Sequence, residues 1–266
     1  MTVGEGLAVA AIGFGGGVFG GLLGIGGSIV MIPLLAVALG PNQQLYQAAC
    51  MIVNVVVAIS AVRRHALAGS VRRDCFRWML PASAVAVLVG VAIGNRVPNR
   101  SLQTVFGVFL LYTAASECWR ALRRLPDEAN HESQVTPAVA IGVGSGTGLV
   151  AGLLGIGGGT IAVPLLRSLA RLPLRQAIGT SSAVMVLASA IGAVAKNMTV
   201  TSLHQPDGQP ITLAMSLTIA GALSPTAWVG AIVGARLTYA LPLGIVRLAF
   251  GVLIALGGLR MCGLLG

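Results

Sequence analysis

A glycine-rich block that occurs twice is the feature of this sequence best suited to chemistry. The block Gly-Leu-Leu-Gly-Ile-Gly-Gly begins at Gly21 and again at Gly152, and each copy is followed by Pro-Leu-Leu, at Pro33 and at Pro164. Both copies lie inside long apolar stretches. Within a membrane, unwound backbone is tolerated only where protein buries it or where it lines a cavity. Helices interrupted at matching positions of two halves are typical of a transport site.

Each block is expected to end one helix and to begin another, at Ser28 and at Thr160. The first N–H groups of a helix have no partner within it and carry the positive end of its dipole, so they can hold an anion. Two such helix starts would seat an oxyanion without a Lys or Arg side chain in the membrane. The candidate substrate-binding residues of the two blocks are Gly24, Gly26, Gly27, Ser28, Gly155, Gly157, Gly158, Gly159 and Thr160.

Hydroxyl side chains near the start of the following apolar segment are further candidates. Thr180, Ser181 and Ser182 can donate hydrogen bonds to an oxyanion or cap a helix. The first half offers Cys50, a weak thiol donor, in the equivalent place, and Asn54 lies one helical turn beyond it. A hydrogen bond between helices would explain Asn54 equally well. We therefore expect a lopsided substrate site with most of its hydrogen bonding in the second half.

Ionisable side chains are nearly absent from the expected membrane spans, and this limits the chemistry. Arg96 and Arg236 mark span ends, where a long cationic side chain reaches the membrane surface at little cost. The sequence has no nucleophile with an adjacent base, no phosphate-binding loop and no pair of carboxylates, and its four cysteines are scattered. We therefore expect no catalytic residue, no metal site and no cofactor.

The composition predicts an all-α polytopic membrane protein. Hydrophobic residues make up 56% of the chain and charged residues 9%, which is too little charge to cover a soluble domain of this length. Several uncharged windows are long enough for a helix to cross a hydrocarbon core of about 30 Å. The net charge of +10 comes from arginines in short connections, which indicates membrane topology and not nucleic-acid binding.

The chain is expected to consist of two homologous halves. Beyond the glycine blocks, the stretch that begins at Gly90 and ends at Arg96 matches the stretch from Gly230 to Arg236. We divide the chain into a first membrane repeat (1–125), a polar linker (126–135) and a second membrane repeat (136–266). Duplication and fusion of one ancestral half explains this pattern.

The distribution of basic residues favours inverted repeats over parallel ones. A single helix over residues 6–40 would be roughly 50 Å long at about 1.5 Å per residue, and it would leave the Lys and Arg residues almost evenly split. If each glycine block instead turns the chain back, only Arg96, Arg100, Lys196 and Arg260 of the 17 Lys and Arg residues lie on the side opposite the rest. Lys and Arg accumulate on the cytoplasmic side. We therefore expect each half to hold a glycine-broken or re-entrant helix with one short arm, followed by three transmembrane helices.

These blocks resemble the TauE/SafE family of sulfite exporters, also called the toluene-sulfonate uptake permease family. The resemblance covers essentially the whole chain and rests on the doubled glycine block with its proline, on Ala177 to Ser181 and on Gly230 to Leu237. It implies secondary transport of anions such as sulfite, sulfonate or sulfoacetate, mostly export, across the inner membrane of bacteria. Ser28 stands where the family has a third glycine, and Ala49-Cys50 stands where it has Thr-Ser.

Several alternatives remain open at this point. An anion channel would conduct without counterflow, and a transporter of another organic anion would share the same fold. A membrane scaffold or a redox module that uses the cysteines belongs to a different class. The expected partners are a small anionic substrate and membrane lipid, and proton coupling and a homodimer are left open.

Overall fold

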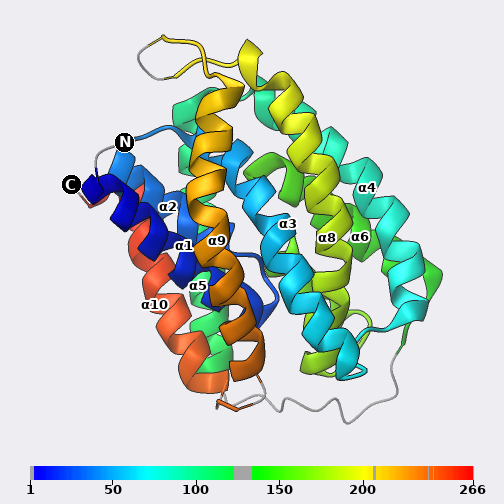
Figure 1. The fold of residues 1–266 in the computed structure, drawn as a ribbon. Helices are drawn as coiled ribbons and strands as arrows, with labels where there is room; N and C mark the ends of the chain where they lie inside the picture. The colour runs from blue at the N-terminus through cyan, green and yellow to red at the C-terminus, as the bar shows by residue number, and fades with distance from the viewer. Residues whose placement is uncertain (1–2, 123–133, 206–207, 239, 242, 266) are drawn as a thin grey trace.

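The computed structural model describes residues 3–122, 134–205, 208–238, 240–241 and 243–265. These residues form helices, with one short 3-10 turn at Val200–Ser202 and an isolated bridge between His204 and Pro210 (Figure 1). The helices of the first half are α1 (Val3–Leu23), α2 (Ser28–Leu39), α3 (Gln43–Leu67), α4 (Arg73–Arg96) and α5 (Asn99–Leu122). Those of the second half are α6 (Pro137–Leu154), α7 (Gly159–Ser168), α8 (Leu174–Thr199), α9 (Leu213–Leu237) and α10 (Leu243–Met261). The all-α prediction is therefore confirmed, while most of the predicted linker lies outside the described residues.

Seven of the described helices are long and apolar enough to cross a membrane, namely α1, α3, α4, α6, α8, α9 and α10. Large apolar side chains such as Val85, Val194 and Met198 are exposed on the outside of the bundle, as a lipid-facing surface requires. The helix α5 has 24 residues and carries Arg100, Glu117 and Arg120, and it is not one of the seven. The chain is a multi-pass membrane protein.

Each half begins with a helix that is broken and turned back, as predicted. Gly24 and Gly26 have φ angles of +65° and +85°, and Gly155 and Gly157 have φ angles of +72° and +71°. Glycine adopts this left-handed backbone without the cost that a Cβ imposes. The long arms are followed by short ones, α2 with 12 residues and α7 with 10. Gly16 and Gly20 of α1 lie against Gly27, so α2 folds back onto α1 as the second arm of a hairpin.

Glycine stripes hold each hairpin against the other half of the chain. The α1 stripe lies directly on the backbone of α9 and consists of Gly13, Gly17 and Gly21. The α6 stripe lies on the backbone of α4 and consists of Gly144, Gly148 and Gly152. Small residues at a spacing of four let helix backbones approach closely in a membrane. The two halves therefore interleave, with the long arm of each hairpin packed on a helix of the other repeat.

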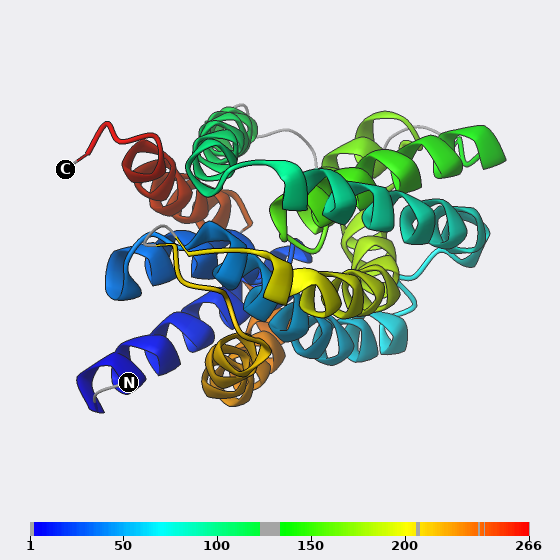
Figure 2. The ribbon, with the colours of Figure 1, turned by 90° about the horizontal axis from the view of Figure 1, so that it is seen from above.

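Helices that occupy equivalent places in the two halves run antiparallel. Gln44, near the start of α3, bonds to Lys196, near the end of α8, while Thr180, near the start of α8, bonds to Arg72, beyond the end of α3. Gly107 of α5 lies against Cys262, beyond the end of α10. Seen from above, α3 and α8 lie side by side near the middle of the bundle (Figure 2). Inverted repeats would give this arrangement, and the orientation of the halves in a membrane stays a prediction.

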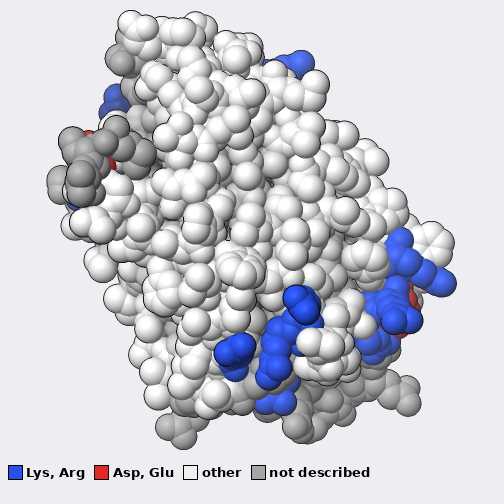
Figure 3. Space-filling model, in the orientation of Figure 1, with Lys and Arg blue, Asp and Glu red and all other residues white. Residues whose placement is uncertain are grey.

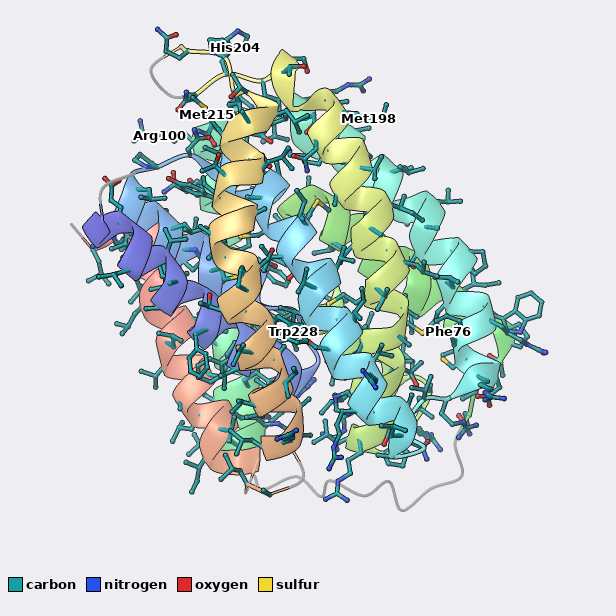
Figure 4. The ribbon with its side chains drawn as sticks, viewed as in Figure 1. Phe76, Arg100, Met198, His204, Met215 and Trp228 are labelled. Carbon is teal, nitrogen blue, oxygen red and sulfur yellow. The ribbon has the colours of Figure 1, made fainter. Side chains whose placement is uncertain are left out.

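Basic side chains gather at one end of the bundle. They lie toward the lower end of the face shown in Figure 3, where α3 ends and α4 begins. Arg100 lies at the other end, with His204 and Met215, whereas Phe76 and Trp228 lie lower down (Figure 4). We expect the lower end to face the cytoplasm because Lys and Arg accumulate there.

Candidate functional site

We call the turn between the two arms of each hairpin its tip, residues 24–27 in the first half and 155–158 in the second. The two tips meet inside the protein. A Cβ added to Gly159 would collide with the backbone of Gly24 and Ile25, and a Cβ added to Gly26 would lie 2.9 Å from the Ile156 carbonyl oxygen. All residues of both tips are buried. As predicted, both helices are interrupted, and the fold brings the two interruptions together. The second arms, α2 and α7, begin close to each other inside the bundle.

Asn54 of α3 joins the two tips. Its side-chain Nδ2 donates to the Ser28 hydroxyl at 2.9 Å and to the Gly155 carbonyl oxygen at 3.4 Å. Its Oδ1 accepts from the Ser28 backbone N–H at 3.2 Å. That N–H is one of the free donors at the start of α2. The oxygen of Asn54 therefore occupies the position where we expected an anion to bind in the first half.

Met185 of α8 faces the same two tips from the other half. Its sulfur lies 3.1 Å from a Cβ position on Gly26 and 2.9 Å from one on Gly157. A thioether does not donate a hydrogen bond and accepts one only weakly. The helices α2 and α7 both follow a glycine, Gly27 and Gly158, which has no side chain to cap the helix, and Gly158 has a φ of +83°. The start of α7 therefore differs from the start of α2, where an amide side chain accepts the first N–H.

The serine hydroxyls of α8 lie at the first tip. The Ser181 hydroxyl donates to the carbonyl oxygens of Gly24 at 3.1 Å and of Ile178 at 3.0 Å. Ser182 is fully buried beside Gly24, and its hydroxyl has no hydrogen-bond partner among the described residues. Thr160, at the start of α7, donates only a long bond of 3.5 Å to the Ile25 carbonyl oxygen. These three hydroxyls lie beside the joined tips, and their contact with a substrate stays a prediction.

Two of the candidate residues have other surroundings. The Thr180 hydroxyl accepts from the Arg72 backbone N–H at 3.0 Å, and this bond anchors the loop before α4 to α8. Cys50 is a fully buried free thiol on α3. Of the predicted residues on α3, Asn54 is the one whose polar atoms bond to the tips.

Thr147 of α6 is a residue that the sequence argument missed. It is buried, and its methyl group lies beside Gly158 at the start of α7. Within the part of the chain that the structure describes, its hydroxyl has no hydrogen-bond partner. The sequence does carry a signal for it, because Thr147 interrupts a run of small residues from Gly144 to Gly148 at the place where the first half has Gly16. A hydroxyl is present in one repeat and absent from the other at this position.

Two buried cationic side chains lie within helices, where we expect ionisable groups to be nearly absent. Lys196, which we expect on the side with few basic residues, lies in the last turn of α8 and is 1% exposed. Its ammonium donates to the side-chain oxygens of Gln44 and Asn95. Arg247 of α10 is also buried. A lysine near a helix end can turn inward when neighbouring helices supply amide oxygens, and the sequence alone does not show which way it turns.

Comparison with known proteins gives a consistent result over nearly the whole chain. A family model described as sulfite exporter TauE/SafE matches residues 9–261. The "Probable membrane transporter protein MamO" of Paramagnetospirillum magneticum is 29% identical over 96% of this chain and 43% of the relative. The chain thus spans less than half the length of that relative. The "Probable membrane transporter protein YunE" of Bacillus subtilis is 24% identical over 86% of this chain and 87% of the relative. No solved structure matches.

Proposed function

This chain belongs to the sulfite exporter TauE/SafE family, a family of membrane transporters, and we propose that it is a secondary transporter of small sulfur-containing oxyanions. Sulfite, sulfonate and sulfoacetate are the substrates that we propose, with export across the bacterial inner membrane as the direction. The family description supports the substrate class. The geometry of the two tips supports the place where the anion binds.

The observation that carries the proposal is the difference between the starts of α2 and α7. Asn54 accepts the Ser28 N–H, whereas the equivalent residue of the second repeat, Met185, brings a thioether sulfur to Gly157, just before α7. Free N–H groups and the positive end of the helix dipole favour an anion. The hydroxyl of Thr160 lies at the same helix start and can donate to the anion. We therefore place the oxyanion at the start of α7.

Two unpartnered hydroxyls add donors close to this place. The hydroxyls of Ser182 and Thr147 are buried, and no described residue forms a hydrogen bond with either of them. A buried polar group without a partner costs about 1–3 kcal/mol, so such groups are retained where a ligand or water satisfies them. An oxyanion with three or four oxygens could accept from these hydroxyls after a small movement of the tips.

Alternating access would follow from movement of the hairpins against α4 and α9. The glycine stripes of α1 and α6 give close contact with those helices, and rocking of one repeat against the other around a central site is common among transporters with inverted repeats. The bound anion would then face one side of the membrane at a time.

A flux experiment in proteoliposomes tests the proposed function. Purified protein is reconstituted into liposomes, and the liposomes are loaded with unlabelled anion. Uptake of labelled sulfite, thiosulfate, sulfonate or carboxylate is then measured with and without a pH gradient. We expect accelerated exchange of sulfite or a sulfonate when the same anion is present inside. Conductance without such counterflow would favour the anion channel, and flux of carboxylates alone would overturn the substrate class.

A further inference from the structure

A polar hollow lies between α5 and α7 and leads to the start of α7. It has a volume of about 250 Å³, and its polar lining comes from Thr113, Ser116, Glu117, Arg120, Thr160 and Ser168. A second, narrow hollow shares Thr113, Glu117, Arg120 and Thr160 with it, and its lining also includes Ile25 at the first tip and Arg247 on α10. Charged side chains of α5 and α10 therefore line neighbouring hollows beside the hairpin tips.

Three charged side chains form one cluster beside these hollows. Glu117 lies between two arginines, with 3.6 Å from its Oε1 to Nη1 of Arg120 and 3.6 Å from its Oε2 to Nε of Arg247. Both distances are longer than those of a close charged hydrogen bond, which is about 2.7–2.9 Å. Two guanidinium groups therefore lie beside one carboxylate in this cluster. Arginine is well suited to an oxyanion because its planar group can donate two parallel hydrogen bonds.

The other repeat provides an internal comparison. An equivalent hollow of about 250 Å³ lies between α2 and α10, with Pro33 in the place that Pro164 has in the first hollow. Its lining is apolar, including Val30, Leu34 and Leu253, and the one charged residue that lines it is Arg260. Equivalent hollows of the two repeats thus differ, since polar and charged side chains line the one that ends at Thr160 and mostly apolar side chains line the other.

We infer that the hollow between α5 and α7 is a loading site for the anion, with Arg120 and Arg247 as its cationic ligands and Glu117 as the group that the anion displaces. In this arrangement Glu117 serves as an internal counter-ion while the site is empty. An arriving oxyanion takes over the arginine hydrogen bonds and then passes Thr113 to reach Thr160. This inference rests on the proposed function and extends it by naming the side chains that capture the substrate.

The test compares charge variants in the proteoliposome assay with the sulfur oxyanion that the wild-type protein moves. Arg120→Gln is expected to raise KM about tenfold, because a charged hydrogen bond is lost, while the maximal rate stays within about twofold. Glu117→Gln is expected to lower KM severalfold, since it removes the competing carboxylate. Arg247→Lys keeps the charge and loses the paired donors, so we expect it to raise KM less than Arg120→Gln does. The matched control is Arg260→Gln in the apolar hollow, which should leave KM unchanged.

A binding readout makes the result independent of turnover. Millimolar sulfite is expected to raise the thermal unfolding temperature of the wild-type protein and of Arg260→Gln, and to have little effect on Arg120→Gln. An unchanged KM and an unchanged thermal shift in Arg120→Gln would overturn the loading site, as would an equal effect of Arg260→Gln. If the wild-type protein moves no sulfur oxyanion, the proposed function itself fails, and this outcome is distinct from an unchanged variant.

Discussion

Asn54 and Met185 occupy the same position in the two repeats, and both lie against both hairpin tips. Asn54 accepts the first N–H of α2 and donates to Gly155 of the other tip. Met185 touches Gly26 and Gly157 without offering a strong hydrogen bond. One repeat thus supplies its own oxygen to the helix start, and the other supplies only a thioether, so we propose that a ligand completes the second helix start. Several predictions about anion binding depend on this difference.

Asn54→Asp should abolish anion flux. A carboxylate next to the starts of α2 and α7 would act as a fixed anion and repel the substrate. Asn54→Ala should instead lower the free energy of unfolding by about 1–3 kcal/mol, because the Ser28 N–H loses its partner, while it keeps measurable flux. Flux and thermal unfolding of the purified variants check both effects, with Met185→Leu as a control that should change neither strongly. Wild-type flux in Asn54→Asp would contradict the assigned anion position.

Gly159→Ala should stop transport while the protein still reaches the membrane. The added Cβ would collide with the backbone of Gly24 and Ile25 at the contact between the tips, so the tips would have to separate. Gly157→Leu and Gly26→Leu should have the same effect, because both glycines have positive φ angles and close neighbours. Gly142→Ala is the matched control, since nothing lies within 4 Å of its Cβ position. Flux by Gly159→Ala equal to that of Gly142→Ala would argue against a tightly fitted site.

Lys196→Met should leave the KM for the anion within about twofold of the wild-type value. Lys196 bonds to Gln44 and Asn95 near the end of α8, away from the tip contacts of Asn54. In our account the start of α7 carries the charge complementarity at the central site, and this lysine does not. The measurement is the concentration dependence of flux. A rise in KM of tenfold or more would indicate that Lys196 itself binds the anion.

Cysteine labelling tests the orientation in the membrane. In a variant without its native cysteines, His204→Cys should react with an impermeant reagent added to intact cells, because this exposed loop lies at the end with few basic residues. Leu67→Cys should react only after the cells are opened, because Leu67 is exposed at the end of α3, on the opposite side of the bundle from His204. The reverse pattern would place the arginine-rich end outside.

Removal of the native cysteines tests the redox alternative. Loss of all flux on removing cysteines other than Cys50 would favour a redox role.

Much of the fold could be predicted because it depends on features that repeat along the sequence. The glycines at 24, 26, 155 and 157 take left-handed backbone, and their doubled occurrence predicted both breaks and the short second arms. Gly13 and Gly17 of α1 lie on the backbone of α9, a close approach that small residues at a spacing of four permit. The partner helix could not be predicted, because a small-residue stripe shows that a backbone approaches and not which one.

The candidate site was predicted in part. Ser181, Ser182 and Asn54 lie at the tips, since their positions on α3 and α8 follow from the repeat. Thr180, one residue away from Ser181, bonds to Arg72, because successive helical residues point about 100° apart. The inward turn of Lys196 and the grouping of Glu117 with Arg247 depend on contacts between the two halves. Such contacts leave no local pattern in the sequence.

The most direct measurement is an anomalous difference map of the protein with bound selenite, a heavier analogue of sulfite. Our account predicts a selenium peak at the start of α7, within hydrogen-bond distance of Thr160 and between the two hairpin tips. The account is contradicted if the protein transports sulfite but the selenium peak lies beside Lys196 and no peak lies at the start of α7.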